Sequence, residues 1–215
     1  MDNTKNKYAM DKKNKGSLTI TKWIVFTTLG WLIGLISAIL IADLLDKINL
    51  DFFGLGLGIT TGIGLMQWIV LRRHTTINYK WMWLTIAGMG SSFLLFNIIL
   101  VILKALDFKV EMDGAPAMIT IIMAVALGSF LTGQFQSKLL KKNNFTNTDG
   151  WVLYSFLAWT TCSIFISVYF VCMNNVFHLA FTTVGKLMNL VAFLLIGPIL
   201  GYISGKKILT ILHTP

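Results

Sequence analysis

Residues 52–73, which read FFGLGLGITTGIGLMQWIVLRR, decide the fold. The run carries no charge until it ends at Arg72 and Arg73, and roughly 20 such residues are enough for one helix to cross a bilayer. Five other stretches of the chain have similar length and composition. The six predicted spans are residues 23–42, 52–71, 82–103, 116–136, 151–172 and 187–205. The sequence therefore predicts an all-α integral membrane protein with six transmembrane helices.

The composition of the whole chain excludes a soluble globular protein. Of its 215 residues, 55% are hydrophobic and 13% are charged, whereas about 25% are charged in a soluble domain. The formal net charge of +9 does not indicate nucleic-acid binding, because the basic residues form short clusters between apolar runs. Such clusters are typical of topology signals in membrane proteins.

Lysine and arginine alternate between rich and poor loops along the chain. One side of the predicted membrane collects the basic residues of 1–22, 72–80, 138–142 and 206–207. The other side has only Lys47, Lys104, Lys109 and Lys186. Because basic loops stay in the cytoplasm, both termini are predicted to be cytoplasmic, in a bacterial plasma (inner) membrane. Residues 1–22 then form a polar basic segment before a retained first helix, and residues 208–215 form a cytoplasmic tail.

The second and fourth spans end in the same pattern, which indicates an internal repeat. Gly64-x-x-Gln67-x-x-x-Leu71-Arg72-Arg73 matches Gly133-x-x-Gln136-x-x-x-Leu140-Lys141-Lys142 position for position. The sixth span ends in a weaker copy, Gly201-x-x-x-Gly205-Lys206-Lys207, and Trp23, Trp81 and Trp151 open the odd-numbered spans. We expect three tandem helical hairpins in parallel orientation, at about 23–73, 81–142 and 151–207 within a transmembrane domain of 23–207, around a pseudo-threefold axis. The alternative is that tryptophan and basic residues at the helix ends are common to any membrane hairpin.

The end of the second span also carries a resemblance. The segment Gly62-x-Gly64-x-x-Gln67-Trp68-x-Val70-Leu71-Arg72-Arg73, followed by a span that begins with tryptophan, resembles a signature of uncharacterised bacterial multi-pass membrane proteins. This resemblance implies a fold and a compartment, but it brings no activity.

Aromatic residues predict where the helix ends lie in the membrane, and small residues predict which helix faces pack together. Trp23, Trp81, Trp83 and Trp151 open spans on the cytoplasmic side, where we expect their rings at the membrane interface. Glycines recur at every fourth position in two spans and are expected to pack helices closely. These ridges are Gly54, Gly58 and Gly62 in one span and Gly197, Gly201 and Gly205 in the other. Asn97 and Asn189 are expected to tie helices together, and residues 174–186 to form an interfacial turn of helix.

The sequence offers little for catalysis. His74, His178 and His213 lie in loops or the tail, and no metal-binding or nucleophile motif accompanies them. An enzyme, a cofactor and a metal site are therefore not expected, and the outer acidic residues Asp107, Glu111 and Asp113 are interpreted as a solvated loop. No charged residue lies deep in a span, which disfavours ion-coupled transport.

Two hypotheses cover the paired patterns at the ends of the second and fourth spans. In the first, six residues converge on one cytoplasm-facing site for an anionic headgroup or a small anion. They are Gln67, Arg72, Arg73, Gln136, Lys141 and Lys142. In the second, each glutamine bonds a neighbouring helix, while the basic pairs meet anionic headgroups of the membrane lipids.

Two functions remain open. The first is a membrane protein of transporter or channel type that binds or passes a small molecule or lipid. Its support is the repeat, the glycine-lined helices and the neutral polar residues. The alternative is a non-transporting scaffold or regulatory subunit that packs against a partner membrane protein. It is supported by the absence of intramembrane charge and of a soluble domain.

Overall fold

The computed structural model describes residues 18–106, 114–173 and 182–213, and this part of the chain contains six long helices. They are α2 (Ile20–Asp46), α3 (Asp51–His74), α4 (Lys80–Ala105), α5 (Gly114–Lys142), α6 (Trp151–Val171) and α7 (Thr183–His213). All six are long and apolar enough to cross a membrane, so the predicted spans are confirmed and the chain is a multi-pass membrane protein. Helices suit this environment because each satisfies its own backbone hydrogen bonds in lipid.

Most helices extend beyond the predicted apolar spans. α7 continues to His213, and α2 begins at Ile20, where the side chain of Thr19 accepts a hydrogen bond from the Lys22 amide. A helix can continue into the headgroup layer, so polar residues at its ends do not stop it. The expected interfacial turn at 174–186 lies mostly outside the described residues, as do Asp107, Glu111 and Asp113, and from Thr183 onwards the chain belongs to α7.

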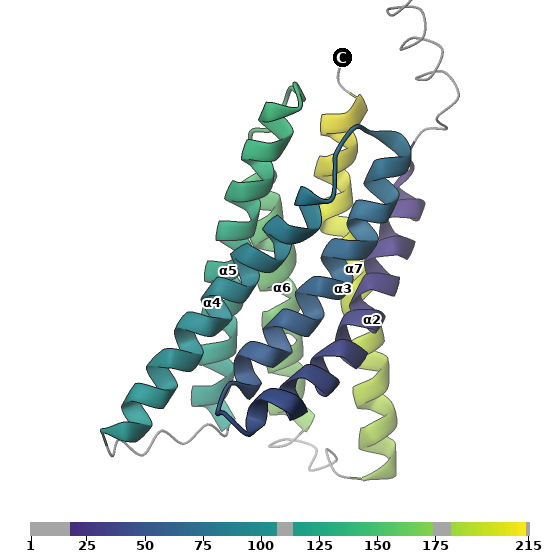
Figure 1. The fold of residues 1–215 in the computed structure, drawn as a ribbon. Coiled ribbons are helices and arrows are strands. Elements are labelled where there is room, and N and C mark those ends of the chain that lie inside the picture. The colour runs from purple at the N-terminus through teal and green to yellow at the C-terminus, as the bar shows by residue number, and fades with distance from the viewer. Residues whose placement is uncertain (1–17, 107–113, 174–181, 214–215) are drawn as a thin grey trace, which may run out of the picture.

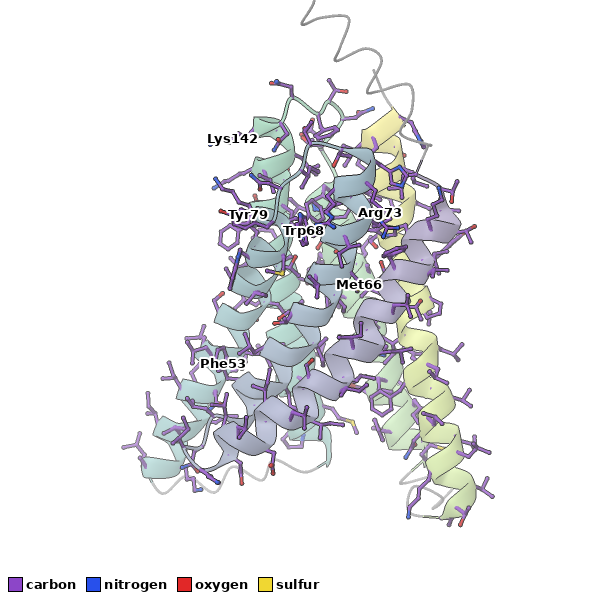
Figure 2. The ribbon with its side chains drawn as sticks, turned by 45° about the vertical axis from the view of Figure 1, so that its right-hand side comes forward. Phe53, Met66, Trp68, Arg73, Tyr79 and Lys142 are labelled. Atoms are coloured by element: carbon purple, nitrogen blue, oxygen red, sulfur yellow. The ribbon has the colours of Figure 1, made fainter. Side chains whose placement is uncertain are left out.

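The six helices form a closed ring. Each helix packs against its neighbours in sequence, and α7 packs against α2 to complete the ring. The start of α2, the end of α7 and the turns α3–α4 and α5–α6 lie at the same end of the bundle, the upper end in Figure 1. We call it the basic end, because Arg72, Arg73, Lys80, Lys141 and Lys142 lie there. The helices lie closer together at this end than at the opposite one (Figures 1 and 2).

The largest buried side chains gather near the basic end. One cluster joins Trp23, Trp81 and Trp151 with Leu71 and Leu140. These three tryptophans are only 0–2% exposed, so the prediction that their rings lie at the lipid interface is wrong. Trp83, by contrast, is 56% exposed. Position along a helix predicts depth in the membrane, but it does not tell which face of the helix turns toward the protein.

Both glycine ridges pack against α2, which confirms their predicted role. A Cβ atom added at Gly54 would lie 2.8 Å from the Cα of Ala42, and one added at Gly201 would lie 2.9 Å from the Cα of Ile24. Gly54 belongs to α3 and Gly201 to α7, so α2 is held between two small-residue surfaces. Such surfaces let membrane helices gain dispersion contacts that longer side chains would prevent.

The two predicted tie points are also confirmed. Asn97 of α4 accepts a hydrogen bond from the Phe53 amide (3.0 Å) and donates one to the Asn49 carbonyl (2.6 Å), which joins α4 to the start of α3. Asn189 of α7 accepts a hydrogen bond from the Tyr169 hydroxyl of α6 (2.9 Å). Phe53 lies toward the end opposite the basic end in Figure 2. Side-chain amides thus join α4 to the start of α3, and α7 to α6.

Candidate functional site

Three buried hydrogen bonds of the same kind join neighbouring helices of the ring. In each, a tryptophan near the start of one helix donates its indole N–H to a polar side chain on the adjacent helix. They run from Trp81 Nε1 to Gln67 Oε1 (3.3 Å), from Trp151 Nε1 to Gln136 Oε1 (3.1 Å) and from Trp23 Nε1 to Ser204 Oγ (3.0 Å). These contacts connect α3 with α4, α5 with α6, and α7 with α2.

The acceptors occupy the same position in the helix-end pattern. Each acceptor lies three residues after a buried glycine and four residues before a fully buried leucine or isoleucine. The glycines are Gly64, Gly133 and Gly201, and the apolar residues are Leu71, Leu140 and Ile208. Ser204 was not among the predicted site residues, because the third copy of the pattern has serine where the other two have glutamine. The spacing of three residues from Gly201 is the signal that could have found it.

A second set of polar side chains lies one helical turn after the tryptophans. The Thr85 hydroxyl donates to the Trp81 carbonyl (2.9 Å) and accepts from Gln136 Nε2 (2.8 Å). The Ser155 hydroxyl donates to the Ser129 carbonyl (3.3 Å). Thr27 has the corresponding position in α2, and its buried hydroxyl has no hydrogen-bond partner among the residues that the structure describes. Gln136 therefore bonds both Thr85 and Trp151, and it links α4, α5 and α6.

These polar side chains surround a small cavity inside the bundle. Its volume is about 10 Å³, enough for about one water molecule. It is lined by residues of α3, α4, α5, α6 and α7. The lining residues are Gln67, Thr85, Thr132, Gln136, Trp151, Ser155, Trp159, Leu200 and Ser204. The lining contains no charged residue, so the cavity is a neutral hydrogen-bonding site within an apolar bundle.

The cavity offers both donors and acceptors. Among the described residues, the Gln67 amide nitrogen has no hydrogen-bond acceptor, so its two N–H groups are available. Ser204 accepts one hydrogen bond and donates another to the Leu200 carbonyl (2.7 Å), which leaves one lone pair of its oxygen. Gln136 Oε1 likewise accepts one bond, from Trp151, and has capacity for another. An occupant must therefore both accept and donate hydrogen bonds.

The structure separates the six residues that the sequence combined into one candidate site. Gln67 and Gln136 are buried and line the same cavity, whereas Arg72, Arg73, Lys141 and Lys142 are exposed and do not line it. Arg73 and Lys142 lie on the outside near the basic end in Figure 2.

The basic side chains make their own surface contacts. The Arg72 guanidinium lies 4.8 Å from the centre of the Trp68 ring, and that of Arg73 lies 5.5 Å from the Phe26 ring. Lys141 Nζ lies 3.3 Å from an oxygen of the exposed Asp149. Stacking on aromatic faces orders a guanidinium while its edge stays free for an anion.

Comparisons of the chain with protein-family models, with curated proteins and with solved structures find no match.

Proposed function

We propose that this chain is a plasma-membrane protein of transporter or channel type, which binds or passes a small uncharged molecule at the cavity between its helices. The observation that supports this proposal is a neutral, hydrogen-bonding cavity lined by five helices of an otherwise apolar bundle. A buried polar group that lacks a partner costs free energy, so donors left over inside a membrane protein favour an occupant. The lining has no carboxylate or imidazole to serve a nucleophile, and the proposal therefore assigns it binding and no catalytic step.

The proposal includes three parallel hairpins, α2–α3, α4–α5 and α6–α7, as repeated units. Its support is the threefold recurrence of the tryptophan hydrogen bond at matching positions. The closed ring is compatible with a pseudo-threefold axis along the membrane normal. The cavity then lies where the three units meet, which is a common place for the binding sites of transporters built from repeats.

The proposal also places the basic end at the cytoplasmic face, with both termini inside a bacterial cell. Its support is the gathering of exposed arginine and lysine at this end. A basic residue near an anionic lipid surface contributes about 1 kcal/mol to membrane attraction. Arg72, Arg73, Lys141 and Lys142 would bind lipid headgroups there, while Gln67 and Gln136 serve the cavity.

Reconstitution into lipid vesicles tests the solute proposal. Stopped-flow light scattering after osmotic shock measures permeation of water, urea and glycerol, and potassium chloride serves as the ionic control. We expect faster permeation of one or more of the uncharged solutes than in vesicles without protein. Potassium chloride permeation should be unchanged, because a cavity with space for about one water molecule is too small for a hydrated ion.

A matched pair of variants on α5 makes this test specific. Gln136→Met removes the amide that lines the cavity, whereas Gln134→Met makes the same change two residues away, where the side chain does not line it. We expect only Gln136→Met to lower the permeation rate. Equal rates for both variants and for empty vesicles would contradict the proposal.

The scaffold alternative has its own supporting observation. The cavity has space for only about one water molecule, and the glycine contacts hold α2 tightly between α3 and α7, so the remaining surface for recognition is the exterior. Purification in mild detergent distinguishes the two functions. A membrane protein that copurifies in stoichiometric amount, together with unchanged vesicle permeability, would favour the scaffold.

A further inference from the structure

The third hairpin differs from the other two at two positions that line the cavity. Four residues after the first tryptophan of each hairpin, the chain has Thr27, Thr85 and Ser155 in turn. Three residues after the glycine of each helix-end pattern, it has Gln67, Gln136 and Ser204. In both sets the side chain of the third hairpin is the smallest. Ser155 and Ser204 also both line the cavity.

We propose that Ser155 and Ser204 create the cavity and limit its occupant in this closed ring to one uncharged, water-sized molecule that both donates and accepts hydrogen bonds. This inference rests on the proposed function, because it concerns the same cavity and assumes the repeat. It adds the size of the occupant and the residues that determine it. Serine is smaller than threonine by one methyl group, and smaller than glutamine by three heavy atoms.

The hydrogen-bonding groups around the cavity fit such an occupant. A molecule in the cavity can accept from Gln67 Nε2, which has no other acceptor among the described residues. It can donate to the remaining lone pairs of Ser204 Oγ and Gln136 Oε1. Buried waters typically make about three hydrogen bonds, and a polar cavity of about 10 Å³ suffices for one. A purely apolar guest of the same size would leave the glutamine donors unsatisfied.

Ser155→Thr is the smallest change that we expect to close the cavity. Threonine already occupies the matching position at Thr27 and Thr85, where it is buried inside the bundle. The Thr85 hydroxyl bonds the carbonyl four residues before it, so a helix in this ring accepts the side chain. The added methyl group is about as large as the one water molecule that the cavity can hold. Ser155→Ala is the control in the opposite direction: it enlarges the cavity, and alanine is compatible with the α6 helix.

Hydroxyl-radical footprinting of the purified full-length protein measures whether the cavity holds water. Ionising radiation converts bound water into radicals that oxidise the nearest side chains, and mass spectrometry locates the products. Three tryptophans that are at most 2% exposed provide an internal comparison, since Trp151 lines the cavity whereas Trp23 and Trp81 do not. We expect Trp151 to be oxidised several-fold faster than Trp23 and Trp81 in the unmodified protein.

The two variants decide whether the side chain of Ser155 sets the cavity size. We expect Ser155→Thr to lower Trp151 oxidation to the rate of Trp81 without lowering the melting temperature. Ser155→Ala should keep the fast rate. Slow oxidation of Trp151 in the unmodified protein would show a dry cavity and overturn the inference, whether or not a variant folds. An unchanged fast rate in Ser155→Thr would equally overturn it.

The vesicle and footprinting experiments can contradict the proposed function and the water-sized site independently of each other. If Trp151 is oxidised quickly but the vesicles show no added permeability, the cavity holds a bound water molecule and the protein does not transport the solutes. Added permeability combined with slow oxidation would reject the water-sized site and keep the proposed function, with the solute passing elsewhere.

Discussion

Gln67 and Gln136 show why a buried amide in a membrane helix needs a specific partner. In lipid an unpaired amide costs several kcal/mol, and each of these side chains instead accepts an indole N–H from the next helix. Trp81 and Trp151 thereby contribute both ring area and a hydrogen bond to the same contact, and their rings lie 5.6 Å apart between centres. The two glutamine amides therefore join neighbouring helices by hydrogen bonds, and they also line the cavity.

Replacing Trp81 tests how much its hydrogen bond to Gln67 stabilises the protein. Trp81→Phe removes the N–H that Gln67 accepts and reduces the ring volume in the core, so we expect a lower melting temperature in detergent. The hydrogen bond alone accounts for about 1 kcal/mol between membrane helices. Trp83→Phe is the matched control, because Trp83 is exposed two residues away and its loss should change stability by less than about 0.5 kcal/mol. Equal melting temperatures for the two variants would show that the hydrogen bond is dispensable.

At the scale of the elements, α2 packs closely against a glycine ridge on each of its two neighbours. It contacts the glycines of α3 on one side and those of α7 on the other, and the ring is closed by this second contact. Trp31 adds a hydrogen bond from its indole N–H to the Phe193 carbonyl of α7 (2.8 Å). Close packing of small residues and hydrogen bonds across the interface replace the hydrophobic driving force that is missing in lipid.

Gly201→Ala tests the closure of the ring. The added Cβ atom would lie 2.9 Å from the Cα of Ile24, so α2 and α7 must separate and the melting temperature should fall. Gly90→Ala is the control, because its Cβ atom would lie 3.7 Å from the nearest Phe53 atom, an ordinary van der Waals distance. Both changes carry the same gain in helix propensity, and the difference between them isolates packing. Equal melting temperatures for Gly201→Ala and Gly90→Ala would show that the close contact between α2 and α7 does not contribute to stability.

The whole molecule has one end rich in exposed basic residues, and this asymmetry predicts its orientation. Thr76 lies in the α3–α4 turn at the basic end, and Lys47 lies in the α2–α3 turn at the opposite end. In a Cys172→Ala background, which leaves only the buried Cys162, we expect Lys47→Cys to react with an impermeant thiol reagent in intact cells. Thr76→Cys should react only after the cells are opened. The reverse pattern would invert the proposed topology.

Length and composition were sufficient to predict the six helices, because a helix in lipid satisfies its backbone locally and needs only an apolar run of adequate length. The same local reasoning predicted that the glycine ridges pack helices and that the two glutamines need partners. It did not predict the partners. Gln67 bonds a tryptophan 14 residues away, and Ser204 bonds Trp23 across 181 residues of chain.

Only the tertiary structure decided which face of each helix turns inward, and thus that three tryptophans expected at the lipid interface lie in the core. It also separated the buried glutamines from the exposed arginines and lysines, although they are close in sequence. Residues five positions apart lie more than one helical turn apart and point in different directions, so a shared motif does not make a shared site. The cavity arises where five helices meet, and no single segment contains it.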